Sequence, residues 1–230
     1  MSSVATSNPW CSRVRPWRRP SDRIALWQVA STLGLWIVAW TCSAWLWRRD
    51  PFLAMTVVPI HAALMVRLFV LMHDCSHHSL FATRRANDLV GFWLGALFLT
   101  PHREWRRSHA IHHATASCLA KRNPGDIYTM TEDEYAAAPA RKRLAYRLKR
   151  NPLIMLGLGP IVVFLIKQRF KGSLCAGRPR GRRWLQLQAT TLSSLALGAA
   201  GCLLLGAAPF LTIWSLSFSI ATEQAPLTAA

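Results

Sequence analysis

The chain has 230 residues, enough for one or two domains, and about half of them are hydrophobic. Lysine and arginine together number 28 against 10 acidic residues, which gives a net charge of +18. Because these basic residues alternate with long apolar runs, they indicate a multispan membrane protein and argue against nucleic-acid binding. The six cysteines are scattered without a C-x-x-C pair, which argues against a disulfide framework or a structural zinc site.

The first third of the chain predicts a membrane hairpin. Residues 1–23 are polar and rich in arginine, so we expect a flexible basic cytosolic arm. The 24 residues from 24 to 47 carry no charge, which is enough for one spanning helix, and residues 52–72 predict a second. His61 in this second span lies about 18 Å along a straight helix from His73. We expect it to be a hydrogen-bonded histidine within the membrane, outside any metal site.

Two later apolar segments, 87–100 and 153–166, are too short to cross a bilayer, so we expect both to be embedded without crossing. Between them, residues 131–134 (Thr-Glu-Asp-Glu) have the pattern of a capping box that opens a helix. A basic amphipathic helix is expected after Pro139. It is suited to an anionic lipid surface, or it is simply a solvated basic helix.

The end of the chain predicts a third span at 184–205 and a fourth at 206–220, which is cut short before a tail at 221–230. Of the 28 basic residues, five precede the first span, thirteen lie in 84–150 and seven in 167–183. These 25 residues share one side of the membrane, which the positive-inside rule makes cytosolic. We therefore predict an all-α membrane protein with about four spanning helices in one domain over 24–220, and with a histidine-rich cytosolic helical cap.

Seven of the eight histidines lie between residues 73 and 113, mostly in two groups. The first histidine cluster is His73-Asp-Cys-Ser-His-His78, and the second is His109-Ala-Ile-His-His113. If each segment is helical, positions three or four apart place several imidazoles of each cluster on one face. Five or six neutral imidazoles converging on one place favour a metal ion such as iron, zinc or copper.

The two clusters resemble the first two histidine boxes of the membrane fatty acid desaturases, in particular the bacterial acyl-lipid, omega-type branch. The likeness extends over roughly residues 24–220 and includes the stretches 66–69, 73–81, 105–115, 125–131 and 146–152. It implies a non-haem centre of two iron ions at the cytosolic membrane face, with O2 as co-substrate, which inserts a cis double bond into an acyl chain. Breaking an unactivated C–H bond requires a redox metal, because protein acid–base groups cannot do so.

The resemblance also implies which residues form the site. The implied metal ligands are His73, His77, His109, His112 and His113, together with His78, whose side chain need not point the same way as that of His77. Asp74 and Glu104 are candidate acceptors that would orient ligand N–H groups, with a surface ion pair as the alternative for each. His102 stands seven residues before His109 and could reach the same face, although it lies outside the second box.

No histidine follows His113, whereas the family has a third histidine box after its last span. We interpret the chain as a truncated, frame-shifted or fragmentary desaturase, and we do not expect full activity from this chain alone. The alternatives are a related membrane hydroxylase or ketolase with the same centre, and a catalytically inactive membrane remnant.

The resemblance implies an acyl-lipid or fatty acyl substrate that reaches the site from the bilayer. It also implies an electron carrier of the ferredoxin or cytochrome type, which we expect to be acidic because it would dock on a basic cytosolic face. We expect the protein to lie in a bacterial inner membrane, with its N-terminus and both histidine clusters in the cytosol.

Overall fold

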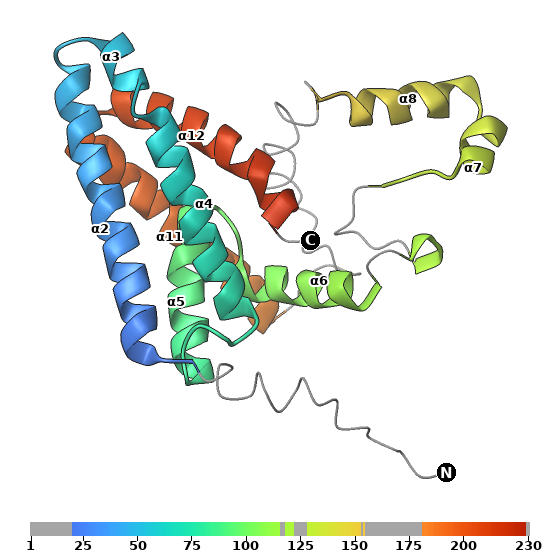
Figure 1. The fold of residues 1–230 in the computed structure, drawn as a ribbon, viewed down its shortest axis with the longest axis horizontal. Helices are drawn as coiled ribbons and strands as arrows, with labels where there is room; N and C mark the ends of the chain where they lie inside the picture. Colours follow the sequence, from blue (N-terminus) through green and yellow to red (C-terminus); the bar gives the residue numbers. More distant parts are fainter. Residues whose placement is uncertain (1–19, 116–117, 122–127, 153, 155–180, 229–230) are drawn as a thin grey trace.

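The computed structural model describes residues 20–115, 118–121, 128–152, 154 and 181–228. Within these ranges every regular element is a helix, which confirms the all-α prediction (Figure 1). The predicted basic arm lies almost wholly outside the described residues, as does nearly all of the short apolar segment at 153–166.

Three stretches are long and apolar enough to cross a membrane, judged by length and composition alone. They are α2 (Asp22–Trp47), α3 (Pro51–Met55) joined to α4 (Val58–Ser76), and α11 (Arg182–Leu205). The hairpin turn forms because Asp50 caps α3, accepting a hydrogen bond from the Phe52 N–H at 2.8 Å, with Pro51 in the first turn. The three longest predicted spans are therefore helices.

The last helix, α12 (Ala207–Thr228), contains a shorter apolar stretch, Ala207–Ala221, than the other spans. It continues to Thr228, past residue 220, where we expected a separate tail to begin. Its most extensive packing is against α4, so α4 lies between α12 and α2 in the bundle (Figure 1).

Polar contacts join the membrane helices at two points. The His61 Nε2 atom lies 3.0 Å from the Ser43 hydroxyl, which joins α4 to α2 and confirms that His61 is hydrogen-bonded, as predicted. The Arg67 Nε atom donates to the Thr32 hydroxyl at 2.9 Å across the same pair of helices. Such contacts fix the rotation of one helix against another where lipid offers no polar partner.

Two helices carry the polar end of the bundle, α5 (Arg84–Leu97) and α6 (His102–Thr115). Thr83 caps α5 by accepting a hydrogen bond from the Ala86 N–H at 3.2 Å. The Thr100 N–H then donates to the Gly95 carbonyl at 2.8 Å, which closes the turn from α5 into α6. As a result α6 lies crosswise to α4 and α5, against the end of the bundle (Figure 1).

Among the residues that the structure describes up to 152, three short elements follow: η2 (Leu119–Lys121), α7 (Glu132–Ala137) and α8 (Ala140–Arg150). The capping box predicted at residues 131–134 is present, because Thr131 and Glu134 exchange side-chain to backbone hydrogen bonds of 3.2 and 2.9 Å. The expected basic helix is α8, which buries none of its residues.

Candidate metal centre

The end of α4 and the middle of α6 bring four histidines together. His73 lies in the last turn of α4 and His77 immediately follows that helix, so they are four residues apart on one face. His109 and His113 are likewise four residues apart on α6. Because α6 crosses the end of α4, the two pairs face each other.

The ring nitrogens of these four histidines converge closely. The His109 Nε2 atom lies 3.0 Å from that of His73, 3.2 Å from that of His77 and 2.9 Å from that of His113. All four ligand atoms lie within 4.8 Å of one another. One imidazole nitrogen offers either one hydrogen or one lone pair, so it cannot make three hydrogen bonds at once. The arrangement fits lone pairs directed at a shared cation.

The surroundings favour the neutral form of His77 and His109, and metal ligation requires a neutral imidazole. Burial, and after it the charges of the neighbouring histidines beginning with His73 and His113, lower the pKa of His109 to about 3. Burial and the same two neighbours also lower the pKa of His77. These two rings therefore offer lone pairs to a metal at neutral pH.

Two residues orient the rings of the cluster. The indole of Trp105 stacks on His109 with ring centroids 4.3 Å apart and an interplanar angle of 17°. The Asp74 Oδ1 atom lies 3.2 Å from His73 Nδ1, the contact predicted for a residue that orients a ligand N–H. Since a carboxylate only accepts, this contact places the hydrogen of His73 on Nδ1 and leaves the Nε2 lone pair facing the cluster.

The structure places His112 beside the cluster but outside the group of four. Its ring centroid lies 5.9 Å from that of His113 and 6.0 Å from that of His109. His112 is an expected ligand whose ring lies beside the four-histidine cluster but is not one of its four members.

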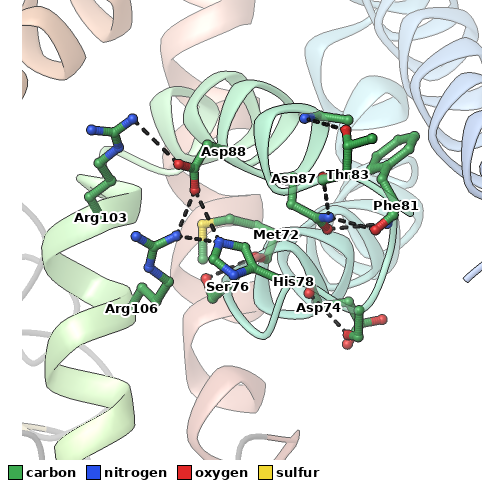
Figure 2. Close-up of polar contacts among 12 residues, drawn as sticks. Met72, Asp74, Ser76, His78, Phe81, Thr83, Asn87, Asp88, Arg103 and Arg106 are labelled. Atoms are coloured by element: carbon green, nitrogen blue, oxygen red, sulfur yellow. Dashed lines mark hydrogen bonds and ion pairs between the residues drawn. The ribbon is translucent and has the colours of Figure 1, made fainter. Parts of the chain in front are cut away.

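His78, by contrast, turns away from His77. Its backbone has a φ of +54°, and its Nε2 atom lies 2.6 Å from Arg106 Nη1 and 3.3 Å from Asp88 Oδ1. Figure 2 shows His78, Asp88 and Arg106 pointing toward one another. Because one ring nitrogen carries either a hydrogen or a lone pair, the His78 Nε2 atom either donates to Asp88 or accepts from Arg106, and in both cases it faces this pair. The structure thus does not bring this expected ligand to the cluster.

The family of the chain is decided by its match to a protein-family profile. The family profile described as fatty acid desaturase matches residues 50–222, most of the chain. The chain belongs to the fatty acid desaturase family. The sequence resemblance is thereby confirmed, and the residues matched include both histidine clusters.

Curated relatives of this desaturase-family chain agree. It is 40% identical over 212 residues to a fatty acid desaturase of Bacillus subtilis, covering 90% of this chain and 58% of that protein. It is 26% identical over 190 residues to a Synechocystis sn-1 oleoyl-lipid 12-desaturase, covering 82% of this chain and 49% of the relative. A Nostoc sn-1 acyl-lipid omega-3 desaturase (ferredoxin) is 32% identical over 46% of this chain and 28% of its own length. The chain thus spans about half the length of the first two, and no solved structure matches it significantly.

Glu104 contacts arginines in this desaturase-family chain. It is buried, and its carboxylate accepts hydrogen bonds from Arg107 at 2.8 Å and from two nitrogens of Arg183 at 3.0 and 2.7 Å. These contacts match the ion pair that was the alternative to a ligand-orienting role for Glu104, except that this ion pair is buried and not at the surface. Glu104 therefore ties α6 to the start of α11.

His102 is not among the four clustered histidines. Its ring packs against Gly91 of α5 and is only 2% exposed. Burial, and after it the charge of Arg106, lower the pKa of His102 to about 4. It is a buried neutral imidazole at the junction of α5 and α6.

Two residues that the sequence analysis missed hold the loop after the first cluster. Asn87 donates to the carbonyls of Phe81 and Thr83 at 2.7 and 2.8 Å and accepts from the Phe81 N–H at 3.1 Å (Figure 2). Burial would raise the pKa of Asp88, but the hydrogen bond with His78 and the charge of Arg106 lower it. The sequence offered one indication that Asp88 has a structural role. It is the only carboxylate between Asp74 and Glu104 in a strongly basic chain.

Proposed function

We propose that His73, His77, His109 and His113 bind iron, with His112 as a further ligand beside them. The observation that carries this proposal is the approach of three other Nε2 atoms to within 3.2 Å of His109 Nε2. Neutral imidazoles suit iron and leave positions for oxygen, and they lack the easily oxidised sulfur of thiolates. The donor set therefore fits iron, and it supplies part of the ligands of the two-iron centre that the family resemblance implies.

We further propose that the chain acts as a fatty acid desaturase, which inserts a double bond into an acyl chain. When bound, iron supplies the O2-dependent redox chemistry that an unactivated C–H bond requires. The chain's own residues hold the site: Asp74 fixes the His73 tautomer, and Trp105 fixes the His109 ring. Phe69 packs edge-on against Trp105 at 5.6 Å, which gives the site an apolar wall toward the membrane helices.

The names of the relatives support the substrate and the electron donor. The Synechocystis relative is named an oleoyl-lipid desaturase, and the Nostoc relative is named an acyl-lipid desaturase with ferredoxin in its name. We propose an acyl-lipid or fatty acyl substrate supplied by the bilayer, and an acidic carrier of the ferredoxin or cytochrome type. We also propose an inner-membrane location, and the positive-inside rule supports an orientation in which the histidine clusters face the cytosol.

The iron proposal is tested by loading the purified chain anaerobically with ferrous iron and measuring metal content and Mössbauer spectra. We expect His109→Ala and His113→Ala to reduce iron to background. The control is His61→Gln, which removes an imidazole from the same helix as His73 but outside the cluster and should leave the iron content unchanged. Full iron in the His109→Ala chain would disprove the assigned site.

The reaction is tested separately by expressing the chain in a bacterial host and analysing its membrane lipids, with each new double bond located. A new cis double bond that disappears with His109→Ala supports desaturation. A hydroxylated or oxo product would instead identify the related hydroxylase or ketolase. Unchanged lipids despite a loaded iron site would indicate an inactive remnant.

A further inference from the structure

A second site lies between α5, the start of α6 and the first turns of α11. It is a pocket of about 350 Å³, and none of the four clustered histidines lines it. Its α5 wall consists of Arg85, Asp88, Leu89 and Phe92, whose spacing places them on one helical face. The volume falls within the range of small-molecule sites, roughly 300–1,000 Å³.

The charges around this pocket favour an anion. Its two carboxylates, those of Asp88 and Glu104, are already paired with arginines. The arginines that pair with them are Arg103, Arg106, Arg107 and Arg183. Arg85 also lines the pocket and makes no ion pair among the residues that the structure describes. Arg85 and Arg103 thus line the pocket, and three further arginines pair with its carboxylates from outside the lining. Guanidinium groups bind phosphate with paired hydrogen bonds.

The pocket wall also contains a polar ring without a partner. His102 lines the pocket and is 2% exposed, and both of its ring nitrogens lack a hydrogen-bond partner among the described residues. Buried polar atoms are nearly always satisfied, so an orphaned ring needs a ligand group or an ordered water. A headgroup hydroxyl or a water held by a headgroup would meet that need.

The surroundings of the pocket indicate a lipid. On α5, Leu89 is 61% exposed and Trp93 is 51% exposed; at the start of α11, Trp184 is 50% exposed and Leu185 is 59% exposed. This end of α11 is also the end of a candidate membrane span. Exposed tryptophan and leucine beside arginine are typical of the boundary between headgroups and acyl chains. A soluble phosphate compound would gain nothing from these apolar side chains.

We propose that this pocket binds the phosphate headgroup of a glycerophospholipid. Arg85 and Arg103 contact the phosphate, and the acyl chains lie against Leu89 and Phe92 of α5. The inference depends on the proposed function only for the membrane setting, because lipid binding here requires neither bound iron nor turnover. In an active protein, this site would hold the lipid near the histidine cluster, since both lie along α6.

The test uses iron-free full-length chain in detergent, with native mass spectrometry to count retained lipid. The probe is phosphatidylglycerol, with diacylglycerol of the same acyl chains and inorganic phosphate as comparison ligands. We expect Arg85→Gln and Arg103→Gln each to weaken phosphatidylglycerol retention about tenfold, the usual effect of losing one charge-assisted hydrogen bond. Arg84→Gln is the matched control, because Arg84 is exposed like its neighbour Arg85 but does not line the pocket.

Each outcome decides the proposal. Loss with Arg85→Gln alongside normal retention with Arg84→Gln supports a built phosphate site. Equal loss in both variants would show general attraction to a basic surface, and equal retention of diacylglycerol would show apolar contact alone. Displacement by millimolar inorganic phosphate would assign the site to a soluble anion; these last three results overturn the inference. A chain that retains lipid through Arg85 yet binds no iron would overturn only the proposed function.

Discussion

Histidine has three different roles in this chain, and each is set by what its ring contacts. His109 is the buried member of the four-histidine cluster, and its lone pair faces three others. His61 lies on the same helix as His73 but bonds Ser43. His78 is adjacent to His77 yet bonds an arginine. Residue type and spacing located the cluster, whereas the role of each ring depended on its partner.

At the scale of single residues, we predict that two adjacent histidines, His77 and His78, differ in their effect on iron content. We expect His78→Gln to retain iron, because its Nε2 contacts Arg106 and Asp88, about 2.6 and 3.3 Å away, and not the cluster. We expect His77→Gln to lose most of the iron, because its Nε2 lies 3.2 Å from that of His109. Metal analysis of both purified variants checks this. Equal loss of iron in both would mean that His78 turns inward when metal binds.

At the scale of elements, close packing between α5 and α6 positions the second histidine cluster. A Cβ at Gly91 would lie 2.4 Å from His102 Nε2, and a Cβ at Gly95 would lie 2.5 Å from the Thr100 carbonyl oxygen. Only glycine permits this approach, which brings the start of α6 onto the face of α5. The position of His109, two turns further along α6, depends on it.

We therefore expect Gly91→Ala to destabilise the protein by about 1–3 kcal/mol, the usual cost of overpacking a close contact. Thermal unfolding in detergent, followed by circular dichroism, measures the effect. Gly34→Ala is the matched control, because nothing lies within 4 Å of a Cβ at that helical position. Its helix should be unchanged or slightly more stable. A neutral Gly91→Ala variant would show that the His102 ring can move aside.

The ion pair between Glu104 and Arg183 should also be measurable. Glu104→Gln removes the charge that two nitrogens of Arg183 contact, so we expect a loss of about 1.5–3 kcal/mol in unfolding free energy. A double-mutant cycle with Arg183→Gln should give a coupling energy of at least about 0.5 kcal/mol.

Arg182→Gln is the control for that cycle. Arg182 is exposed and makes no ion pair among the described residues, so its replacement should change stability by less than about 0.5 kcal/mol. A coupling energy near zero between Glu104 and Arg183 would mean that the pair does not hold α6 against α11.

At the scale of the whole molecule, the spanning helices place both histidine clusters at one end of the bundle. The first cluster lies where α4 ends and the second lies on α6, which crosses that end (Figure 1). The two helices at this end, α5 and α6, carry the basic residues Arg84, Arg85, Arg103, Arg106 and Arg107. An acidic electron carrier would thus meet the centre and a basic surface together.

We expect electron transfer from an acidic ferredoxin to the iron-loaded chain to slow as salt rises. An increase in ionic strength from about 0.05 M to about 0.5 M should lower the rate on the order of tenfold, because salt screens the attraction between the two surfaces. Stopped-flow reduction kinetics provide the measurement, with an uncharged small-molecule reductant as the control. A rate independent of salt would exclude a basic docking surface.

Much of this architecture could be predicted from sequence, because lipid imposes strong constraints on a chain. A run of about 20 apolar residues must form a helix that satisfies its own backbone, so the spans are visible in composition alone. The i, i+4 spacing of His73 and His77, and of His109 and His113, likewise fixes a shared face within each helix. The family and the two halves of the candidate centre follow from these local patterns.

Only the tertiary structure decided which groups meet. The sequence left open whether His78 points the same way as His77, because a left-handed backbone and the contact with Arg106 separate the two adjacent rings. Nor did it show that Glu104 would contact Arg183, 79 residues away, rather than a ligand histidine. Local spacing sets which side chains share a helical face. The packing angle between helices sets what that face contacts, and that angle depends on residues far apart in the chain.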